Sequence, residues 1–287
     1  MRIGQMMLEG AGRFCVSEEG GDWILVSSLG IEAEDLPELI EQLEEIRSRA
    51  SSGRGERVGD QQQLGCPIVR PSKMLAIGLN YMDHIRETGV EAPDRPVVFA
   101  KYPSALNGPF DPIVVEPDLT QQADYEAELA VVIGRRGRRL TPEEALDHVL
   151  GYAVANDVSA REWQKRDVQL SRSKSMDTFC PIGPWITTAD EIPDPQRLGI
   201  RSFVNGEPRQ DSSTAEMLFG VIALIEFLSH TMTLEPGDVI LTGTPHGVGF
   251  AMDPPRFLQP GDRVRCEVEG LGAIENVVVK KPEKRPG

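Results

Sequence analysis

The stretch Gln122-Ala-Asp-Tyr-Glu-Ala-Glu-Leu-Ala-Val-Val-Ile-Gly134 decides the fold of this chain. Side chains alternate between the two faces of a β-strand, so Glu126 and Glu128 point to the same side. The residues after them are apolar at every position, which is typical of a strand buried on both faces. The stretch therefore predicts a core strand that carries two carboxylates to the edge of the protein interior.

These carboxylates have two interpretations. Paired acids repel each other unless a cation neutralises them, and Mg²⁺, Mn²⁺ or Ca²⁺ prefers oxygen ligands. A third acid, Asp157, follows the strand-like run 151–156. Alternatively, Glu126 and Glu128 line a solvated face and Asp157 caps a turn beside Ser159. The residues alone leave both interpretations open.

Short β-branched runs bounded by Gly or Pro dominate the chain from residue 67 onward. A helix is expected after Thr141, where Thr-Pro-Glu-Glu supplies a cap and first-turn acids, and another from about 213 to 230. Strands outnumber helices, so the sequence predicts an α+β, mainly β, region. We expect strands at 74–77, 97–100, 112–115, 129–133, 200–204, 238–241, 263–268 and 273–279.

The first 66 residues differ in composition from the rest. Residues 1–35 contain short apolar stretches, and 36–46 place leucines and isoleucines at helical spacing. The polar, glycine-rich segment 51–65 is typical of a linker. We therefore expect a small N-terminal α/β domain with its linker at 1–66 and a main domain at 67–287.

Composition excludes several classes of protein. The chain has 287 residues with 45 acidic and 30 basic side chains, a net charge of −15 that disfavours nucleic acid. No window reaches the roughly 18 apolar residues of a membrane helix, and the first residues lack a signal-peptide pattern, so we expect a cytoplasmic protein with no membrane partner. The four cysteines form no CxxC pair, which argues against a zinc ribbon or a disulfide framework.

Two further segments contain candidate catalytic residues. His84 and Glu87 are three residues apart and share a face if 78–89 is helical, so the carboxylate could orient the imidazole and make it a base that activates water. Lys174 lies in a turn-rich loop and could stabilise an anionic intermediate. The alternatives are a surface or capping histidine and a solvated loop lysine.

The segment 241–249, Leu-Thr-Gly-Thr-Pro-His-Gly-Val-Gly, follows an expected strand and is rich in small residues. Its backbone N–H groups, including that of Gly243, and the Thr244 hydroxyl can approach a carboxylate closely. A tight structural turn is the alternative.

Taken together and in order, these stretches resemble the fumarylacetoacetate hydrolase family. The resemblance covers most of residues 74–272. It implies a twisted β-roll catalytic domain, a homodimer or higher assembly, and a divalent metal, usually Mg²⁺, held by Glu126, Glu128 and Asp157. The matching stretches are GLNYMDHIRETG, FAKYPSALNGP, DYEAELAVVIG, GYAVANDVSAREWQ, KSMDTFCPIGPW, VNGEPRQDSST, LEPGDVILTGTPHGVG and PGDRVRCEVEGLG.

The same resemblance implies roles for further residues. His84 and Glu87 match a lid pair that activates water in this family. Lys174, Gln164 and Thr244 match positions that contact the substrate or the departing enolate. One departure is Glu162, where the family commonly has aspartate, and its extra methylene alters a supporting contact without touching the three proposed ligands.

The function expected from this resemblance is metal-dependent hydrolysis of a C–C bond in a 2,4-dioxo acid. The substrate would be an acylpyruvate or a 2,4-diketo-3-deoxy sugar acid, and the product pyruvate or a related 2-oxo acid. On the same scaffold the alternatives are isomerisation of 2-hydroxyhepta-2,4-diene-1,7-dioate or 5-carboxymethyl-2-hydroxymuconate, and decarboxylation of oxaloacetate. A non-enzymatic module that binds metal or carboxylates is a further alternative.

Overall fold

A computed structural model describes residues 1–18, 21–59 and 63–281. Its main sheet has the strand order β3-β2-β1-β13-β11-β10-β16-β5-β6, with β4 paired to β1 and β7 paired to β13. Its members after residue 66 are β5 (Met74–Gly78), β6 (Val97–Ala100), β7 (Leu106–Asn107), β10 (Ala127–Ile133), β11 (Val149–Asn156), β13 (Cys180–Thr188) and β16 (Val239–Leu241).

Strand β10 lies inside this sheet between β11 and β16, and both neighbours are antiparallel to it. All seven of its residues are buried, as the unbroken apolar run predicts. Its first residue, Ala127, pairs with Asn156, the last residue of β11. The start of β10 and the end of β11 therefore meet, and the Asp157 N–H donates to the Glu126 carbonyl over 2.9 Å.

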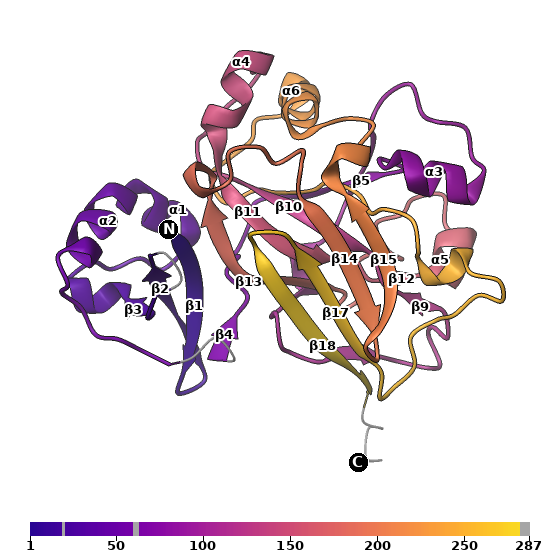
Figure 1. Ribbon diagram of the computed structural model, residues 1–287, viewed down its shortest axis with the longest axis horizontal. Helices are drawn as coiled ribbons and strands as arrows, with labels where there is room; N and C mark the ends of the chain where they lie inside the picture. Colours follow the sequence, from indigo (N-terminus) through magenta and orange to yellow (C-terminus); the bar gives the residue numbers. More distant parts are fainter. Residues whose placement is uncertain (19–20, 60–62, 282–287) are drawn as a thin grey trace.

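A second sheet packs against the first and closes the roll, with the strand order β15-β14-β17-β18-β8. Figure 1 shows β14, β15, β17 and β18 in front of β10 and β11. Val131, Tyr152, Ile200 and Val264 belong to one buried apolar cluster between the two layers. The strands are β8 (Ile113–Val115), β14 (Gly199–Val204), β15 (Glu207–Ser213), β17 (Arg263–Val268) and β18 (Gly272–Lys280), and a short pair joins β9 (Ala123–Asp124) to β12 (Ser159–Ala160).

The helices of the main region are short. They are α3 (Met82–Thr88), α4 (Pro142–Ala145), α5 (Arg161–Arg166) and α6 (Val221–Thr231). The expected helix from 213 begins only at 221, because Ser213 caps a separate 3₁₀ turn at Thr214–Glu216 and Gly220 is extended. Thr141 and Glu144 form the predicted capping box of α4. Among the described residues, no helix is long and apolar enough to cross a membrane.

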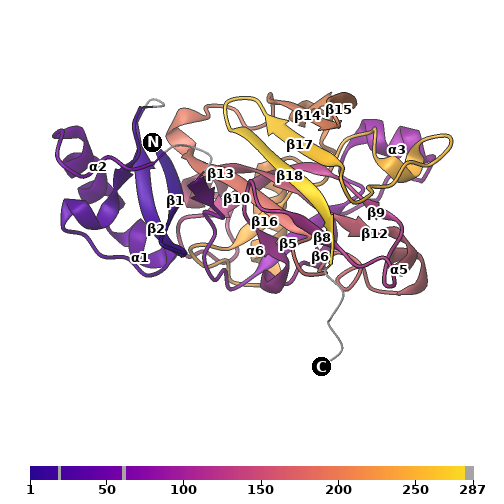
Figure 2. The same cartoon turned by 90° about the horizontal axis from the view of Figure 1, so that it is seen from below.

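The N-terminal region contains β1 (Arg2–Leu8), β2 (Ala11–Ser17), β3 (Ile24–Leu25), α1 (Leu36–Glu41), α2 (Leu43–Ser51) and β4 (Leu64–Gly65). The helical pattern at 36–46 is split at Gln42, whose φ of −106° and ψ of 8° interrupt the helix. Strand β1 pairs with β13, so this region extends the main sheet (Figure 2). The boundary after residue 66 stays a prediction, and residues 60–62 of the expected linker lie outside the described part.

Candidate metal and active site

Three carboxylates meet where β10 begins and β11 ends. Glu126, Glu128 and Asp157 are all buried, and one oxygen of each lies within 4.8 Å of the others. Neighbouring backbone and amide groups hold them: the Gly243 N–H donates to Glu128 Oε2 over 2.8 Å, and the Glu126 N–H donates to Asn156 Oδ1 over 3.0 Å. Three buried carboxylate oxygens at this spacing match the ligands that a divalent cation prefers.

Buried cations surround this acid cluster, by which we mean Glu126, Glu128 and Asp157. Lys174 Nζ lies 2.6 Å from Glu126 Oε2 and 2.8 Å from Asp157 Oδ2. Lys101, whose side chain is fully buried, donates to Asp157 Oδ1 over 2.5 Å. Among the described residues, Glu128 forms no ion pair. The cations therefore neutralise two of the three acids and leave the third without a positive partner.

The pKa values of the two glutamates diverge accordingly. Burial alone would raise the pKa of Glu126, but the charges of Lys174 and Arg161 outweigh it and lower the pKa to about 2. Burial, followed by repulsion from Asp157 and Glu126, raises the pKa of Glu128 well above its ordinary value. Strong divergence between neighbouring acids is typical of functional sites.

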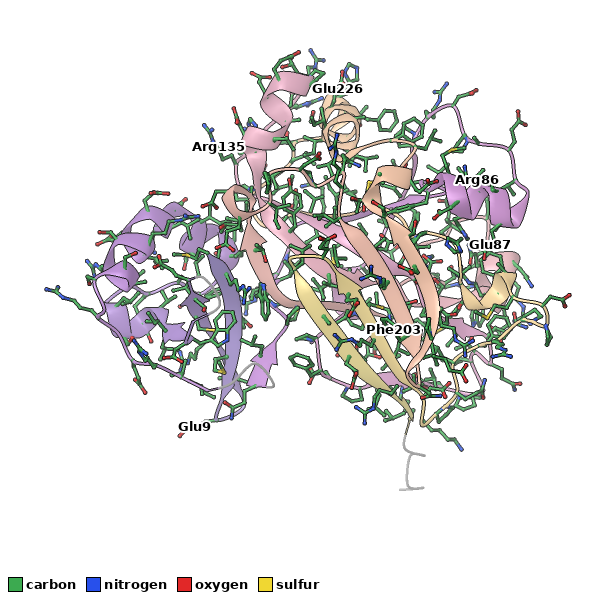
Figure 3. The ribbon with its side chains drawn as sticks, in the orientation of Figure 1. Glu9, Arg86, Glu87, Arg135, Phe203 and Glu226 are labelled. Carbon is green, nitrogen blue, oxygen red and sulfur yellow. The ribbon has the colours of Figure 1, made fainter. Side chains whose placement is uncertain are left out.

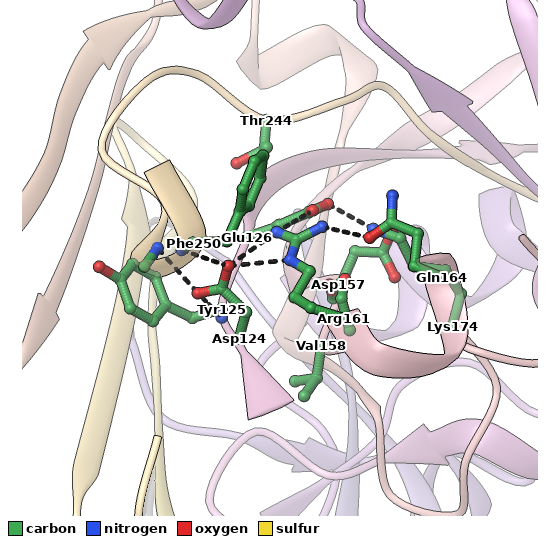
Figure 4. A network of polar contacts seen from close by, with 12 residues as sticks. Asp124, Tyr125, Glu126, Asp157, Val158, Arg161, Gln164, Lys174, Thr244 and Phe250 are labelled. Atoms are coloured by element: carbon green, nitrogen blue, oxygen red, sulfur yellow. Dashed lines mark hydrogen bonds and ion pairs between the residues drawn. The ribbon is translucent and has the colours of Figure 1, made fainter. Parts of the chain in front are cut away.

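Arg161 connects the acid cluster to the wall of the site (Figure 4). Its Nε donates to Asp124 Oδ2 over 2.9 Å, and its Nη1 donates to Gln164 Oε1 over 2.8 Å. Its Nη2 lies 2.7 Å from Glu126 Oε1 and 2.9 Å from Asp124 Oδ2; these two contacts are ion pairs by distance but lack hydrogen-bond angles. The Phe250 ring stacks on the guanidinium at 4.3 Å, so Arg161 is fixed from several directions.

Helix α3 presents the predicted histidine–glutamate pair. His84 Nδ1 lies 3.1 Å from Glu87 Oε2, as expected for residues three apart in a helix. The Gly247 N–H donates to the other oxygen, Glu87 Oε1, over 2.9 Å. Burial would raise the pKa of Glu87, but the hydrogen bonds from His84 and Gly247 lower it. Glu87 is therefore ionised at neutral pH and can orient a His84 ring that carries its proton on Nδ1.

A few polar contacts hold α3 over the roll. Ser212 of β15 donates to Asp83 Oδ2 over 2.5 Å, and Arg86 pairs with Glu216 over 2.7 Å. Figure 3 shows Arg86 and Glu87 on this helix, on the side of the molecule opposite the N-terminal region. The helix ends at Thr88 with Gly89 as its C-cap, and residues 89–95 are mostly exposed. This arrangement is compatible with the lid that the family resemblance implies.

The loop after β16 supports the acid cluster from the other side. Gly243 has a φ of +98°, and a Cβ there would lie 2.9 Å from the Cβ of Asn80, so the close approach requires glycine. Its N–H, expected to meet a substrate carboxylate, instead donates to Glu128. The Thr244 hydroxyl donates to the Ala127 carbonyl over 2.9 Å and accepts from Gln210 over 2.8 Å. In this structure the loop therefore positions strand β10 and one proposed ligand.

A cavity of about 440 Å³ opens above the acid cluster. Five of the nine residues proposed from the sequence line this cavity, namely His84, Glu126, Gln164, Lys174 and Thr244. The other four lie directly behind the lining and are bonded to it or to one another: Glu87, Glu128, Asp157 and Gly243. Its apolar lining is Ile77, Leu79, Val90, Val97, Phe99, Leu170 and Phe250, and its polar lining is His84, Glu126, Arg161, Gln164, Lys174, Thr244 and Thr88. Such a mixture of apolar walls and convergent charges suits a small anionic ligand.

A larger hollow of about 570 Å³ lies over β17 and β18. Its charged side chains already pair with one another: Arg263 of β17 lies 2.9 Å from Glu275 of β18, and Arg265 lies 3.0 Å from Glu267 on the same strand. It contains no cluster of buried carboxylates. We therefore place the candidate site in the smaller cavity, where the titratable groups are buried and perturbed.

Reasoning from the sequence missed Lys101, Asp124 and Arg161. Each lies inside a quoted stretch, but none stands at a spacing that indicates a site. For Lys101 and Arg161 the available signal was charge balance, because three buried acids require cations and these stretches contain few. Asp124 is an acid, and charge balance does not indicate it. The acidic and basic partners of these residues are distant in sequence: Lys101 and Asp157, for example, are 56 positions apart.

Comparison with known proteins agrees with this geometry. The sequence profile described as fumarylacetoacetate (FAA) hydrolase C-terminal matches residues 73–279. The chain is 52% identical to the mitochondrial oxaloacetate tautomerase fahd2 of Xenopus laevis over 218 residues, which are 75% of this chain and 68% of that protein. The profile match at residues 73–279 therefore includes every residue of the acid cluster and of the cavity lining.

Two solved structures extend the comparison over the N-terminal region. A fumarylacetoacetate hydrolase of Exiguobacterium antarcticum covers 98% of this chain and 100% of its own, at 42% identity and a TM-score of 0.86. The maleylpyruvate hydrolase of Sphingobium sp. SYK-6, in complex with manganese(II) and pyruvate, covers the same shares at 32% identity and a TM-score of 0.81. With the profile match and the roll that surrounds the acid cluster, these similarities show that the chain belongs to the fumarylacetoacetate hydrolase family.

Proposed function

We propose that this chain is a divalent-metal-dependent enzyme that interconverts the enol and keto forms of a 2-oxo acid such as oxaloacetate. One observation carries the proposal: His84, Glu126 and Lys174 line the same cavity. Glu87 lies behind His84, and the rest of the buried acid cluster lies behind Glu126. The 52% identity to an oxaloacetate tautomerase supports this reaction over the others open to the family.

The reaction moves one proton. Conversion of enol to keto removes the proton from the enol oxygen and adds a proton to the neighbouring carbon, with no change in the other atoms or in electron count. Glu87 accepts the hydrogen bond from His84 Nδ1, which leaves Nε2 as the nitrogen for proton transfer. Apolar walls such as Phe99 and Leu170 limit water around it.

The enolate formed between these proton transfers needs positive charge. Lys174, whose pKa is raised by Asp157 and Glu126 despite the lowering effect of burial, stays an ammonium at neutral pH. Glu126, Glu128 and Asp157 would hold the metal, which supplies Lewis-acid stabilisation of the enolate oxygen when bound. Mg²⁺ is the proposed ion, with Mn²⁺ or Ca²⁺ as alternatives for the same oxygen donors.

Hydrolysis of an acylpyruvate-type C–C bond, the reaction expected first from the sequence, is the second candidate. The similarity to a maleylpyruvate hydrolase favours it, since the same His84–Glu87 pair can take a proton from water instead of from an enol. The two reactions share the enolate and differ in whether a bond to the second carbonyl is cleaved.

The experiment is a product analysis with purified protein and Mg²⁺. Enol-oxaloacetate, a set of acylpyruvates and 2,4-diketo-3-deoxy sugar acids are supplied in turn, and the loss of enol absorbance and the product masses are recorded. Faster loss of enol-oxaloacetate with unchanged mass, abolished by EDTA, is expected. Pyruvate with a second acid would establish the hydrolase instead, and pyruvate with CO₂ the decarboxylase. Metal binding with no turnover of any substrate would favour a non-enzymatic module.

Assembly and location are separate proposals. We propose a homodimer, which sedimentation at several protein concentrations tests directly. A cytoplasmic location stays a prediction, and the Xenopus relative is named as mitochondrial.

A further inference from the structure

Lys174 differs from the buried cations Lys101 and Arg161 in the groups that contact its charged end. The ion pairs of its ammonium group are with Glu126 Oε2 and Asp157 Oδ2, two oxygens of the acid cluster, at 2.6 and 2.8 Å. Its Nζ also lies over the Phe99 ring in the cavity wall, 5.5 Å from the ring centre. The charge of Lys174 is therefore balanced by the same carboxylates that are proposed to bind a metal.

Arg161 and Lys101 are held by groups outside the acid cluster. Arg161 has Asp124, Gln164 and the Phe250 ring in addition to Glu126. Lys101 donates to the carbonyls of Val158 and Lys174 in addition to Asp157. If a metal takes the carboxylate oxygens, Arg161 keeps Asp124, and Lys101 loses its carboxylate partner but keeps two carbonyls. Lys174 loses both oxygens that hold its ammonium group.

A divalent cation and the Lys174 ammonium carry the same sign and require the same oxygens. Two cations sharing a buried carboxylate pair repel each other strongly, because the interior screens charge poorly. Lys174 also has a flexible four-carbon stem, so its ammonium group can move without movement of the backbone. The cavity beside it is large enough to receive the displaced group.

We propose that Lys174 competes with the divalent cation for Glu126 and Asp157, and that cation binding releases its ammonium group toward the substrate cavity. The inference rests on the metal site of the proposed function. On this inference Lys174 has a role before substrate arrives, because its ammonium group holds the acid cluster together when no metal is bound. Release of the ammonium group also orders the binding steps, since an anionic 2-oxo acid meets a free ammonium group only after the cation is bound.

The test is titration of metal-free protein with Mn²⁺ in the absence of any substrate, followed by electron paramagnetic resonance or calorimetry. Lys174→Met is expected to bind Mn²⁺ at least about tenfold more tightly than the natural chain, a change of about 1.4 kcal/mol. Lys174→Arg, which keeps the charge, should show no such gain. Lys165→Met removes an exposed lysine near the site and should leave the affinity unchanged. Equal or weaker Mn²⁺ binding by Lys174→Met would overturn the inference.

Thermal unfolding gives a second readout that turnover does not affect. Lys174→Met should melt at a lower temperature than the natural chain without metal, because Glu126 and Asp157 lose a cation, and should show a larger rise in Tm with Mn²⁺. If the metal-free variant does not fold, protein refolded with Mn²⁺ is titrated with EDTA. The variant should then require more chelator than the natural chain, and an equal or smaller requirement counts against the inference.

A variant of Glu128 separates this inference from the proposed metal site. Glu128→Gln removes a ligand charge and should abolish tight Mn²⁺ binding. If Glu128→Gln binds Mn²⁺ as well as the natural chain, the metal site itself is wrong. If Glu128→Gln loses binding while Lys174→Met gains none, the metal site stands and only the release of Lys174 fails.

Discussion

The acid cluster and helix α3 face the same cavity but are held in opposite ways. Strand β10 is buried along its whole length and bonded on both sides by β11 and β16. In α3 only His84 and Ile85 are buried, and the helix is held by polar contacts such as Asp83–Ser212. Metal ligands require fixed positions, whereas a group that admits substrate must be able to move away. The proposed site thus combines a rigid floor, the acid cluster, with a more weakly held helix, α3, which is the proposed lid.

The largest expected effect comes from removing a carboxylate of the acid cluster. Asp157→Ala should abolish activity and weaken Mg²⁺ binding by at least about 100-fold, because two carboxylates leave the ion under-coordinated. It also leaves Lys101 and Lys174 short of a partner, which should lower the free energy of unfolding by about 3–5 kcal/mol. Calorimetry and urea denaturation measure the two effects, with Glu143→Ala as an exposed control. Unchanged Mg²⁺ affinity would show that the third ligand is misplaced.

Replacing the proposed base His84 should lower the rate of turnover and leave metal binding by the acid cluster unchanged. His84→Ala is expected to lower kcat by about 10²–10⁴-fold, the usual contribution of a general acid–base group. Mg²⁺ affinity should stay within about twofold, since His84 contacts none of the three proposed ligands by a hydrogen bond. Glu87→Gln should cost less than His84→Ala because it disturbs only the orientation of the ring. Turnover of every substrate at the natural rate in His84→Ala would remove this pair from the reaction.

Hydrogen exchange compares the two regions directly. Amides of α3 and residues 89–95 should exchange much faster than those of β10 when no substrate is present. Ser212→Ala deletes one contact of the lid and should speed exchange in α3 by about fivefold, the equivalent of one hydrogen bond of about 1 kcal/mol. The β10 amides of the same variant serve as the control. Equal protection of α3 and β10 would contradict a lid.

The smallest expected effect is the contribution of Glu87 to the pH dependence of the free energy of unfolding. Because the pKa of Glu87 is lowered in the folded chain, its ionised form stabilises the fold above the unfolded pKa of about 4.5, and this contribution disappears as the pH falls through the lowered value. The difference in unfolding free energy between the natural chain and Glu87→Gln should therefore be constant above about pH 5, at about 1 kcal/mol, and shrink at lower pH. A difference that grows on acidification would reverse the assigned direction.

Local pattern was sufficient for most strands and for placing Glu126 and Glu128 side by side. The expected strand at 97–100 matches β6, that at 263–268 matches β17, and the run after Glu128 forms the buried β10. Strand alternation and helix spacing are local rules, so they place Glu126 beside Glu128 and His84 beside Glu87 correctly. The helix expected from 213 begins late because Gly220 and the Ser213 cap override its apolar pattern.

Contacts made across the fold could not be found in this way. Asp124 and Arg161 meet only because β9 pairs with β12, and each belongs to a short strand or helix with no distinctive pattern. The direction of the Gly243 N–H depends on a backbone φ of +98°. The small residues around Gly243 allow this angle, but their pattern does not predict it. The resemblance to a family located the ligands, but it gave no reason for the cations around them.

The pairing of β1 with β13 has a consequence for any shortened form of the chain. Arg2 and Ile3 of β1 lie opposite Thr187 and Ile186, and all nine residues of β13 are buried. Removing residues 1–66 would turn this interior strand into an exposed, apolar sheet edge, which offers its free N–H and C=O groups to other chains. We therefore expect the N-terminal region to protect the roll from aggregation, even though none of its described residues lines the cavity.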